Sequence, residues 1–192
     1  MTPLPLLAIT VVWVVWLISW IVAAVWADPA AKRPAASEEL LYRVATVAGA
    51  VMLSVSDRLF GGGRLWTLGV GLDWALVAIA ILGLAFTWSA RLYLGRLWSS
   101  SVTRKADHRV IDTGPYALVR HPIYTGIIAA LIATAILKAD LIGIAGLILM
   151  IFGFWLKARL EERFLREQLG AEAYDSYSRR VPMLVPFWPS SA

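Results

Sequence analysis

Residues 122–157, PIYTGIIAALIATAILKADLIGIAGLILMIFGFWLK, decide the fold of this chain. They consist of two apolar runs, 122–137 and 141–157, which only a Lys-Ala-Asp turn separates. Because a hydrocarbon core takes about 20 helical residues to cross, the two runs predict an antiparallel helical hairpin in a membrane. The first run is short for a core about 30 Å thick, which leaves open whether it crosses completely.

Three further apolar runs precede the hairpin, at 4–27, 40–56 and 72–90. Hydrophobic residues make up 59% of the chain, whereas soluble domains have about 45–50%. The sequence therefore predicts an all-α integral membrane protein with about five transmembrane helices and a single domain over residues 1–192. No basic segment precedes the first run, so we expect a retained helix there rather than a signal peptide.

Composition argues against several classes of function. The absence of cysteine excludes disulfides, thiolate metal ligands and cysteine nucleophiles. With His108 and His121 as the only histidines, no metal site is expected. The net charge is +5, but the basic residues flank apolar spans, which indicates contact with membrane lipids and no binding of nucleic acid. We find no internal repeat, which argues against an inverted-repeat transporter.

The distribution of basic residues predicts the orientation of the chain. Fifteen of the 18 lysines and arginines lie in 28–43, in 91–120 and in the tail from Lys157 onward. Five spans place these three regions on one side, and basic loops remain on the cytoplasmic side. We therefore expect the N-terminus outside, the C-terminal tail in the cytoplasm, and the chain in the cell (inner) membrane.

The segment 114–126, GPYALVRHPIYTG, collects polar, basic and aromatic residues directly before the hairpin. Proline is favoured at the first position of a helix, so Pro122 should begin the helix with Arg120 and His121 just before it. Free N–H groups at such a helix end attract anions, and Gly126 permits close approach of a ligand or a helix. Arg-His-Pro alone is usually an interfacial anchor, but the flanking glycines and tyrosines make the string more specific.

A second polar block, EERFLREQLGAEAYDSYSRRVPMLVPF, follows the hairpin. The last helix is expected to continue over 157–169 with an amphipathic stripe that lies on the membrane or caps the bundle. Glu161 and Glu162 point about 100° apart on a helix, so one can face the interior while its neighbour meets solvent. The ordinary alternative is a solvated pair with Arg163 or Arg166 as helical partner.

Together, the two blocks resemble the isoprenylcysteine carboxyl methyltransferase family, in the wider group that includes phospholipid methyltransferases. The family pattern is Arg-His-Pro-x-Tyr-x-Gly, a hairpin of two spans, Glu-Glu, a Leu a few residues on, Gly, and a tail with Tyr-x-x-Tyr, Val-Pro and a final Pro-Phe. The match covers about 114–187, which we interpret as the catalytic core. The matching residues are Arg120, His121, Pro122, Tyr124, Gly126, Glu161, Glu162, Leu165, Gly170, Tyr174, Tyr177, Val181, Pro182, Pro186 and Phe187.

The resemblance implies a membrane methyltransferase that uses S-adenosyl-L-methionine and releases S-adenosyl-L-homocysteine. It implies a lipophilic acceptor, such as an isoprenylcysteine-like carboxylate, and a cofactor pocket made by the hairpin with the cytoplasmic helix and tail. By similarity, Glu162 and Arg180 would serve the reacting side, and Arg180 and Tyr177 would bind the acceptor. The cofactor would be bound by Tyr116, Arg120, His121, Pro122, Tyr124, Gly126, Glu161, Leu165 and Tyr174.

The chemistry of these side chains suits that cofactor. Arg120 or His121 fits its carboxylate, Glu161 fits its amino group or ribose, and the tyrosines fit its flat adenine. Methyl transfer to an acceptor needs positioning and exclusion of water more than acid–base help.

Two other functions stay open. Sterol reductases carry a related Arg-His-Pro-x-Tyr-x-Gly segment and use NADPH, and a non-enzymatic scaffold or accessory protein would bind neither cofactor. The sequence also leaves open whether the acceptor is a carboxylate, a thiol or a lipid amine, which oligomeric state the protein adopts, and whether the segment 91–109 gates the pocket.

Overall fold

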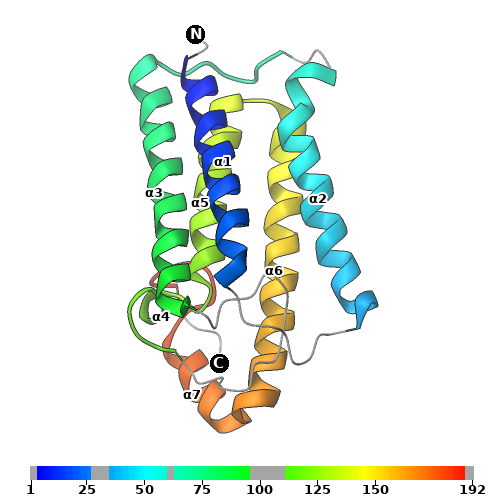
Figure 1. The fold of residues 1–192 in the computed structure, drawn as a ribbon. Helices are drawn as coiled ribbons and strands as arrows, with labels where there is room; N and C mark the ends of the chain where they lie inside the picture. Colours follow the sequence, from blue (N-terminus) through cyan, green and yellow to red (C-terminus); the bar gives the residue numbers. More distant parts are fainter. Residues whose placement is uncertain (1–3, 27–34, 60–62, 96–110, 189–192) are drawn as a thin grey trace.

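The structure is a computed structural model that describes residues 4–26, 35–59, 63–95 and 111–188. These residues form helices and no strand. The elements are α1 (Leu4–Val22), the 3-10 helix η1 (Ala23–Trp26), α2 (Ala36–Leu59), α3 (Val70–Leu94), α4 (Pro115–Leu118), α5 (Pro122–Lys138), α6 (Leu141–Leu169) and α7 (Ala171–Arg180). Five long helices run roughly parallel to a common axis, and α7 lies below them (Figure 1).

The five predicted spans all lie in helices, with shifted ends. The run 40–56 extends to Ala36–Leu59, and α6 continues without a break through the predicted 157–169. Three stretches of the described residues are long and apolar enough to cross a membrane: Leu4–Val25, Val70–Leu94 and Leu141–Glu167. A full crossing by α2 and by the 17-residue α5 stays a prediction.

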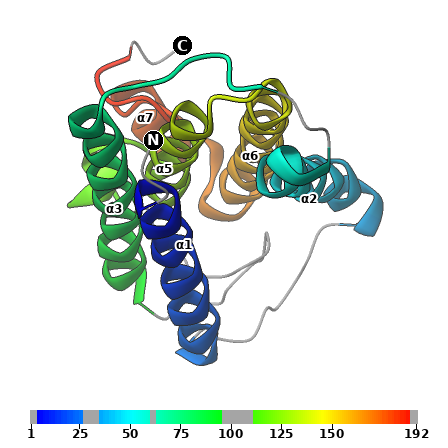
Figure 2. The same ribbon diagram turned by 90° about the horizontal axis from the view of Figure 1, so that it is seen from above.

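The two helices of the hairpin each pack along a helix from earlier in the chain. Figures 1 and 2 show α3 beside α5 and α2 beside α6. Glycines bring these helices close: a Cβ on Gly83 would lie 2.6 Å from the carbonyl oxygen of Gly126, and a Cβ on Gly49 would lie 2.6 Å from that of Gly146. The hairpin is antiparallel as predicted, but its helices are held mainly by α3 and α2.

A row of tryptophans attaches α1 to the pair α3 and α5. Trp13 donates to Thr134 of α5, and Trp16 donates to Thr87 of α3, both at 2.9 Å. Below them the Arg91 guanidinium lies 4.4 Å from the ring centroid of Trp20 and donates to the carbonyl of Ala23. Arg91 is therefore buried in the bundle.

The ends of the helices agree with the predicted five-span topology. The start of α2, the end of α3, the start of α5 and the end of α6 lie at one end of the bundle, opposite the N-terminus (Figure 1). We call this end of the bundle the site end. Most of the proposed gate, 91–109, falls in 96–110, outside the described residues.

Candidate functional site

The start of α5 positions Arg120 and His121 at the site end. Pro122 is the first residue of the helix and His121 is its N-cap, as the sequence predicted. We call residues 181–188, which come after α7, the C-terminal strap. The strap accepts backbone hydrogen bonds from both residues: the amide of Arg120 donates to Pro182 at 2.8 Å, and the amide of His121 donates to Met183 at 3.1 Å.

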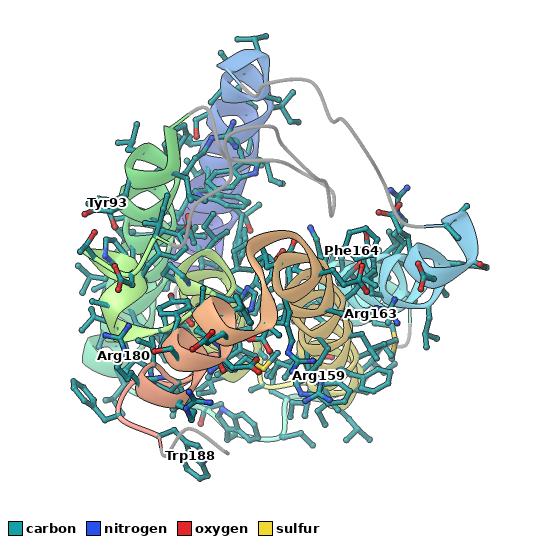
Figure 3. All side chains as sticks on the ribbon, turned by 90° about the horizontal axis from the view of Figure 1, so that it is seen from below. Tyr93, Arg159, Arg163, Phe164, Arg180 and Trp188 are labelled. Atoms are coloured by element: carbon teal, nitrogen blue, oxygen red, sulfur yellow. The ribbon has the colours of Figure 1, made fainter. Side chains whose placement is uncertain are left out.

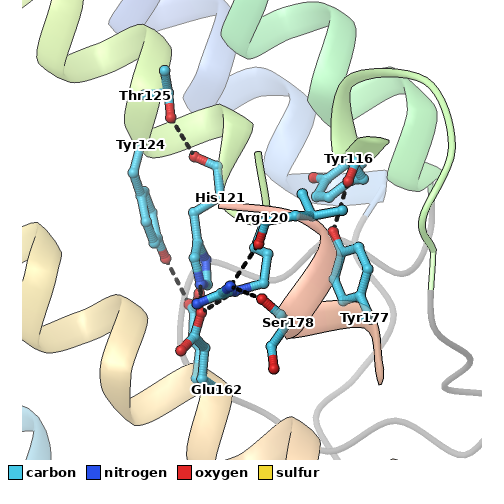
Figure 4. A network of polar contacts seen from close by, with 10 residues as sticks. Tyr116, Arg120, His121, Tyr124, Thr125, Glu162, Tyr177 and Ser178 are labelled. Carbon is cyan, nitrogen blue, oxygen red and sulfur yellow. Dashed lines mark hydrogen bonds and ion pairs between the residues drawn. The ribbon is translucent and has the colours of Figure 1, made fainter. Parts of the chain in front are cut away.

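Glu162, on α6, turns toward His121 (Figure 4), and its neighbour Glu161 also lies beside the imidazole. The imidazole Nε2 lies 3.2 Å from Oε1 of Glu162, and Nδ1 lies 3.5 Å from Oε2 of Glu161. The same oxygen of Glu162 accepts from Nε of Arg120 at 2.7 Å. Both carboxylates face the imidazole, because its ring spans the angle between them and meets one with each nitrogen.

The arginines next to the two carboxylates do not pair with them. Arg163 binds Glu38 at the start of α2, and Arg166 makes two hydrogen bonds, at 2.8 and 2.9 Å, to Asp175 of α7. The alternative of a solvated Glu-Glu pair with helical partners is therefore wrong. These outer ion pairs instead tie α6 to its neighbours.

Tyr124 completes the contact to Glu161. Its hydroxyl donates to Oε1 of Glu161 at 2.6 Å, and its ring stacks on the imidazole of His121 with 5.4 Å between centroids. The ammonium of Lys157, one turn before Glu161 on α6, lies 5.4 Å from the ring centroid of Tyr124. The sequence offered no reason to select Lys157, whose place becomes clear only when α5 and α6 are packed.

The electrostatics of the site centre on His121, whose side chain is 7% exposed. Burial by itself lowers the pKa of this imidazole, but the hydrogen bonds and charges of Glu161 and Glu162 outweigh burial and raise the pKa above its usual value. A protonated imidazole can donate from both nitrogens. The pair of carboxylates therefore favours a cationic His121 at the centre of the network.

Arg120 connects the carboxylates to the last turn of α7. Its NH1 donates to the carbonyls of Ser178 at 2.8 Å and Val181 at 2.6 Å, where a helix end favours a cation. Thr125 adds a bond from its hydroxyl to Leu184 of the strap at 2.6 Å. Neither Ser178 nor Thr125 was selected from the sequence, because both act through contacts between distant segments.

The tyrosines of the site fasten α7 against α4. The hydroxyl of Tyr177 donates to the carbonyl of Tyr116 at 2.7 Å, and Tyr174 and Tyr177 pack with Val181 and Leu165 in one apolar cluster. Burial raises the pKa of Tyr116, Tyr174 and Tyr177. These side chains are therefore neutral at physiological pH, and they lie beside the network of charges.

Two of the predicted site residues do not join the network. The side chain of Arg180 is 63% exposed and reaches Asp112 at 3.4 Å, and Figure 3 shows it on the outside of the bundle. Gly126 lies against α3, where a Cβ would meet the carbonyl of Gly83 and the side chain of Thr87. In this structure Gly126 serves helix packing.

Comparisons with known proteins point to the same part of the chain. The profile of the isoprenylcysteine carboxyl methyltransferase (ICMT) family matches residues 76–167, which contain α5 and both carboxylates. The solved structure of the eukaryotic intramembrane Ras methyltransferase ICMT is 26% identical, with a TM-score of 0.56 over 76% of this chain and 52% of that chain. The resemblance to the ICMT family is confirmed.

Two curated relatives show how far the similarity extends. Protein-S-isoprenylcysteine O-methyltransferase B of Arabidopsis thaliana is 26% identical over 114 residues, which is 58% of this chain and 57% of the relative. Methanethiol S-methyltransferase of Pseudomonas sp. (strain GM41(2012)) is 44% identical over 71 residues, which is 37% of this chain and 26% of the relative. The ICMT-like chain thus spans little more than half of the length of the first and a quarter of the second.

Proposed function

We propose that this membrane protein is an S-adenosyl-L-methionine-dependent methyltransferase that acts on a lipophilic acceptor. The observation that supports this best is the network at the start of α5, where Arg120 and His121 meet Glu161 and Glu162. The match to the ICMT family includes all four residues, and a methyl donor is what that family implies. S-adenosylhomocysteine would be the second product.

The residues present fit the cofactor by their chemistry. It combines a carboxylate and an ammonium in one group, and the network offers both signs of charge within hydrogen-bonding distance of each other. His121 is our choice for the carboxylate and Glu161 for the amino group or ribose. Tyr124 already donates to Glu161 and would keep that carboxylate in place.

The remaining residues would position this set. Arg120 holds Glu162 and the last carbonyls of α7, and Pro122 fixes where α5 begins. Tyr116, Leu165, Tyr174 and Tyr177 supply neutral, largely apolar surroundings next to the charges, which suit an adenine ring. When bound, the cofactor supplies a methyl carbon already activated by positive sulfur.

The acceptor side is the less defined half of the proposal. Glu162 faces the network and remains our candidate on the reacting side, whereas Arg180 would have to rotate from Asp112 to reach an anionic acceptor. The names of the relatives include both a prenylcysteine carboxyl and a thiol acceptor. We propose a lipophilic acceptor that enters from the bilayer, with an isoprenylcysteine-like carboxylate as the first candidate, and a cytoplasmic site end.

Calorimetric titration of the purified protein in nanodiscs tests the proposal. S-adenosylmethionine and S-adenosylhomocysteine are expected to bind with micromolar affinity, His121→Ala is expected to lose that binding, and Arg163→Ala, at an outer ion pair, is expected to keep it. Binding of NADPH instead would indicate the reductase. If neither cofactor bound in several lipids, the proposed methyltransferase function would be wrong.

A further inference from the structure

The C-terminal strap runs alongside the first turn of α5. Pro182 and Met183 accept from the amides of Arg120 and His121, and Leu184 accepts from the hydroxyl of Thr125. Since Thr125 lies in the first turn of the apolar helix α5, the strap rises from α7 to the level at which α5 begins. With α5 in the bilayer, as the sequence predicts, residues 185–188 would lie at the boundary between the bilayer and water.

At this boundary the strap presents large apolar side chains to its surroundings. Phe187 is 93% exposed, Trp188 is 68% exposed and Val185 is 55% exposed. In Figure 3 Trp188 points outward from the edge of the bundle. Aromatic side chains at this depth are typical of residues that lie among lipid headgroups.

The backbone of Phe187 gives a second, independent observation. Its φ is +63°, in the left-handed region that a residue with a Cβ adopts only at a cost. Among the described residues, Phe187 and Ala139 are the non-glycine residues with positive φ. Ala139 is a fully buried helix C-cap, whereas Phe187 follows Pro186 in a turn that the amide of Trp188 closes by donating to the carbonyl of Val185 at 3.2 Å. That position of the turn favours glycine, yet here it carries an exposed aromatic ring.

We propose that Phe187 and Trp188 insert into the interfacial layer of the bilayer and hold the strap against the site. Contact with lipid would offset the backbone strain of Phe187 and remove its ring from water. The exposed Arg179 and Arg180 at the end of α7 put positive charge beside the insertion point, which suits phosphate headgroups. The bilayer thereby keeps the amides of Arg120 and His121 bonded to the strap.

This proposal can be tested without cofactor or activity, so it stands or falls independently of the methyltransferase function. Because the natural chain has no cysteine, Trp188→Cys can carry a single nitroxide label in nanodiscs of phosphatidylcholine and phosphatidylglycerol. We expect the label to collide more with oxygen, which is soluble in lipid, than with a water-soluble nickel chelate. Arg163→Cys, 53% exposed at an outer ion pair, is the aqueous control, and Leu82→Cys, 69% exposed on α3, is the lipid control. A label at 188 that behaves like the label at 163 overturns the proposal.

A substitution at Phe187 distinguishes anchoring by the ring from simple backbone strain. The two predict opposite changes in the rate of hydrogen exchange at the amides that the strap binds. Glycine at 187 removes the strain together with the ring. If the ring anchors the strap, Phe187→Gly should speed hydrogen exchange in the peptide that contains the amides of Arg120 and His121 at least threefold, and Phe187→Trp should leave exchange unchanged. If exchange in the glycine variant is slower than or equal to that of the natural chain, the ring does not hold the strap and the proposal is wrong.

Discussion

The two ends of the α5–α6 hairpin are both rich in polar contacts, but the contacts differ in kind. At the turn between the helices, side chains bind backbone: Lys138 donates to the carbonyl of Leu53 at 2.6 Å, Trp66 donates to that of Ile136 at 2.9 Å, and Asp140 accepts from the amide of Gly143 at 2.6 Å. At the site end, charged side chains bind one another, as Arg120 and His121 do with the carboxylates.

The difference separates a structural end from an end that can bind a ligand. Backbone carbonyls at a helix end need donors whether or not a ligand is present, so the contacts at the turn satisfy a permanent requirement. Charges that neutralise each other in a half-buried network can exchange partners when a zwitterionic ligand enters. We therefore expect substitutions at the site end to affect ligand binding and those at the turn to affect stability alone.

Among the substitutions that compare the two ends of the hairpin, Glu162→Gln is expected to have the largest effect. The substitution removes the charged acceptor shared by Arg120 and His121, and a hydrogen bond to a charged group contributes about 1.5–3 kcal/mol. We expect the affinity for S-adenosylhomocysteine, measured by calorimetry, to fall roughly tenfold to a hundredfold.

Asp140→Ala is the matched control for that prediction. It removes a carboxylate of the same hairpin that caps α6, and loss of an N-cap costs about 1 kcal/mol of stability. Its thermal midpoint should fall while its affinity for the ligand stays unchanged. If both variants lost affinity equally, the distinction between the two ends would fail.

Gly126→Ala should mainly reduce stability, because the added methyl would meet the backbone of Gly83 on α3. Overpacking of this kind costs about 1–3 kcal/mol, to be measured as a lower thermal midpoint in detergent. Gly71→Ala, in the same helix as Gly83 but with nothing within 4 Å of the new methyl, should be neutral or slightly stabilising. If the Gly126→Ala protein kept full stability but failed to bind the ligand, the result would support the predicted contact between Gly126 and the cofactor.

The pH dependence of stability should follow His121. The pKa of His121 is raised in the folded protein, so its proton binds more tightly there than in the unfolded chain. This contribution to stability is complete below the ordinary pKa of about 6.5 and is lost as the pH rises through the higher folded pKa. The thermal midpoint should therefore fall with rising pH above about 6.5, and the fall should be smaller in His121→Asn. Equal slopes for the two proteins would contradict a charged His121.

The helices could be predicted from local sequence signals, and so could the part of the site that adjoins the two ends of the hairpin. The apolar runs and the proline at 122 predicted the hairpin and the start of α5, and the Glu-Glu pair was found because it comes directly after the last apolar run. The orientation of both carboxylates was not predictable, because it depends on an imidazole from another helix. The packing of α3 on α5 through Gly83 and Gly126 likewise needs both helices in place.

The tail was the hardest part to predict. Residues 171–180, AEAYDSYSRR, are polar enough to resemble a loop, yet they form α7 and bury Tyr174 and Tyr177 three positions apart. That spacing was the available signal. The resemblance assigned Arg180 to the site, but both Arg179 and Arg180 are exposed in the structure. A helix separates adjacent residues by about 100°, and only packing fixes its rotation.

The smallest effect is expected for Arg180→Ala, and it tests the one predicted catalytic residue that lies outside the network. Among the described residues, its exposed guanidinium reaches Asp112 and a carbonyl one turn back on α7, and such exposed pairs contribute about 0–1 kcal/mol. Stability and ligand affinity should therefore stay within error of the natural chain, in contrast to Glu162→Gln. A raised KM for an anionic acceptor, with unchanged binding of S-adenosylhomocysteine, would show that Arg180 turns inward with the acceptor. An unchanged KM would leave acceptor binding to residues of the network and remove Arg180 from the site.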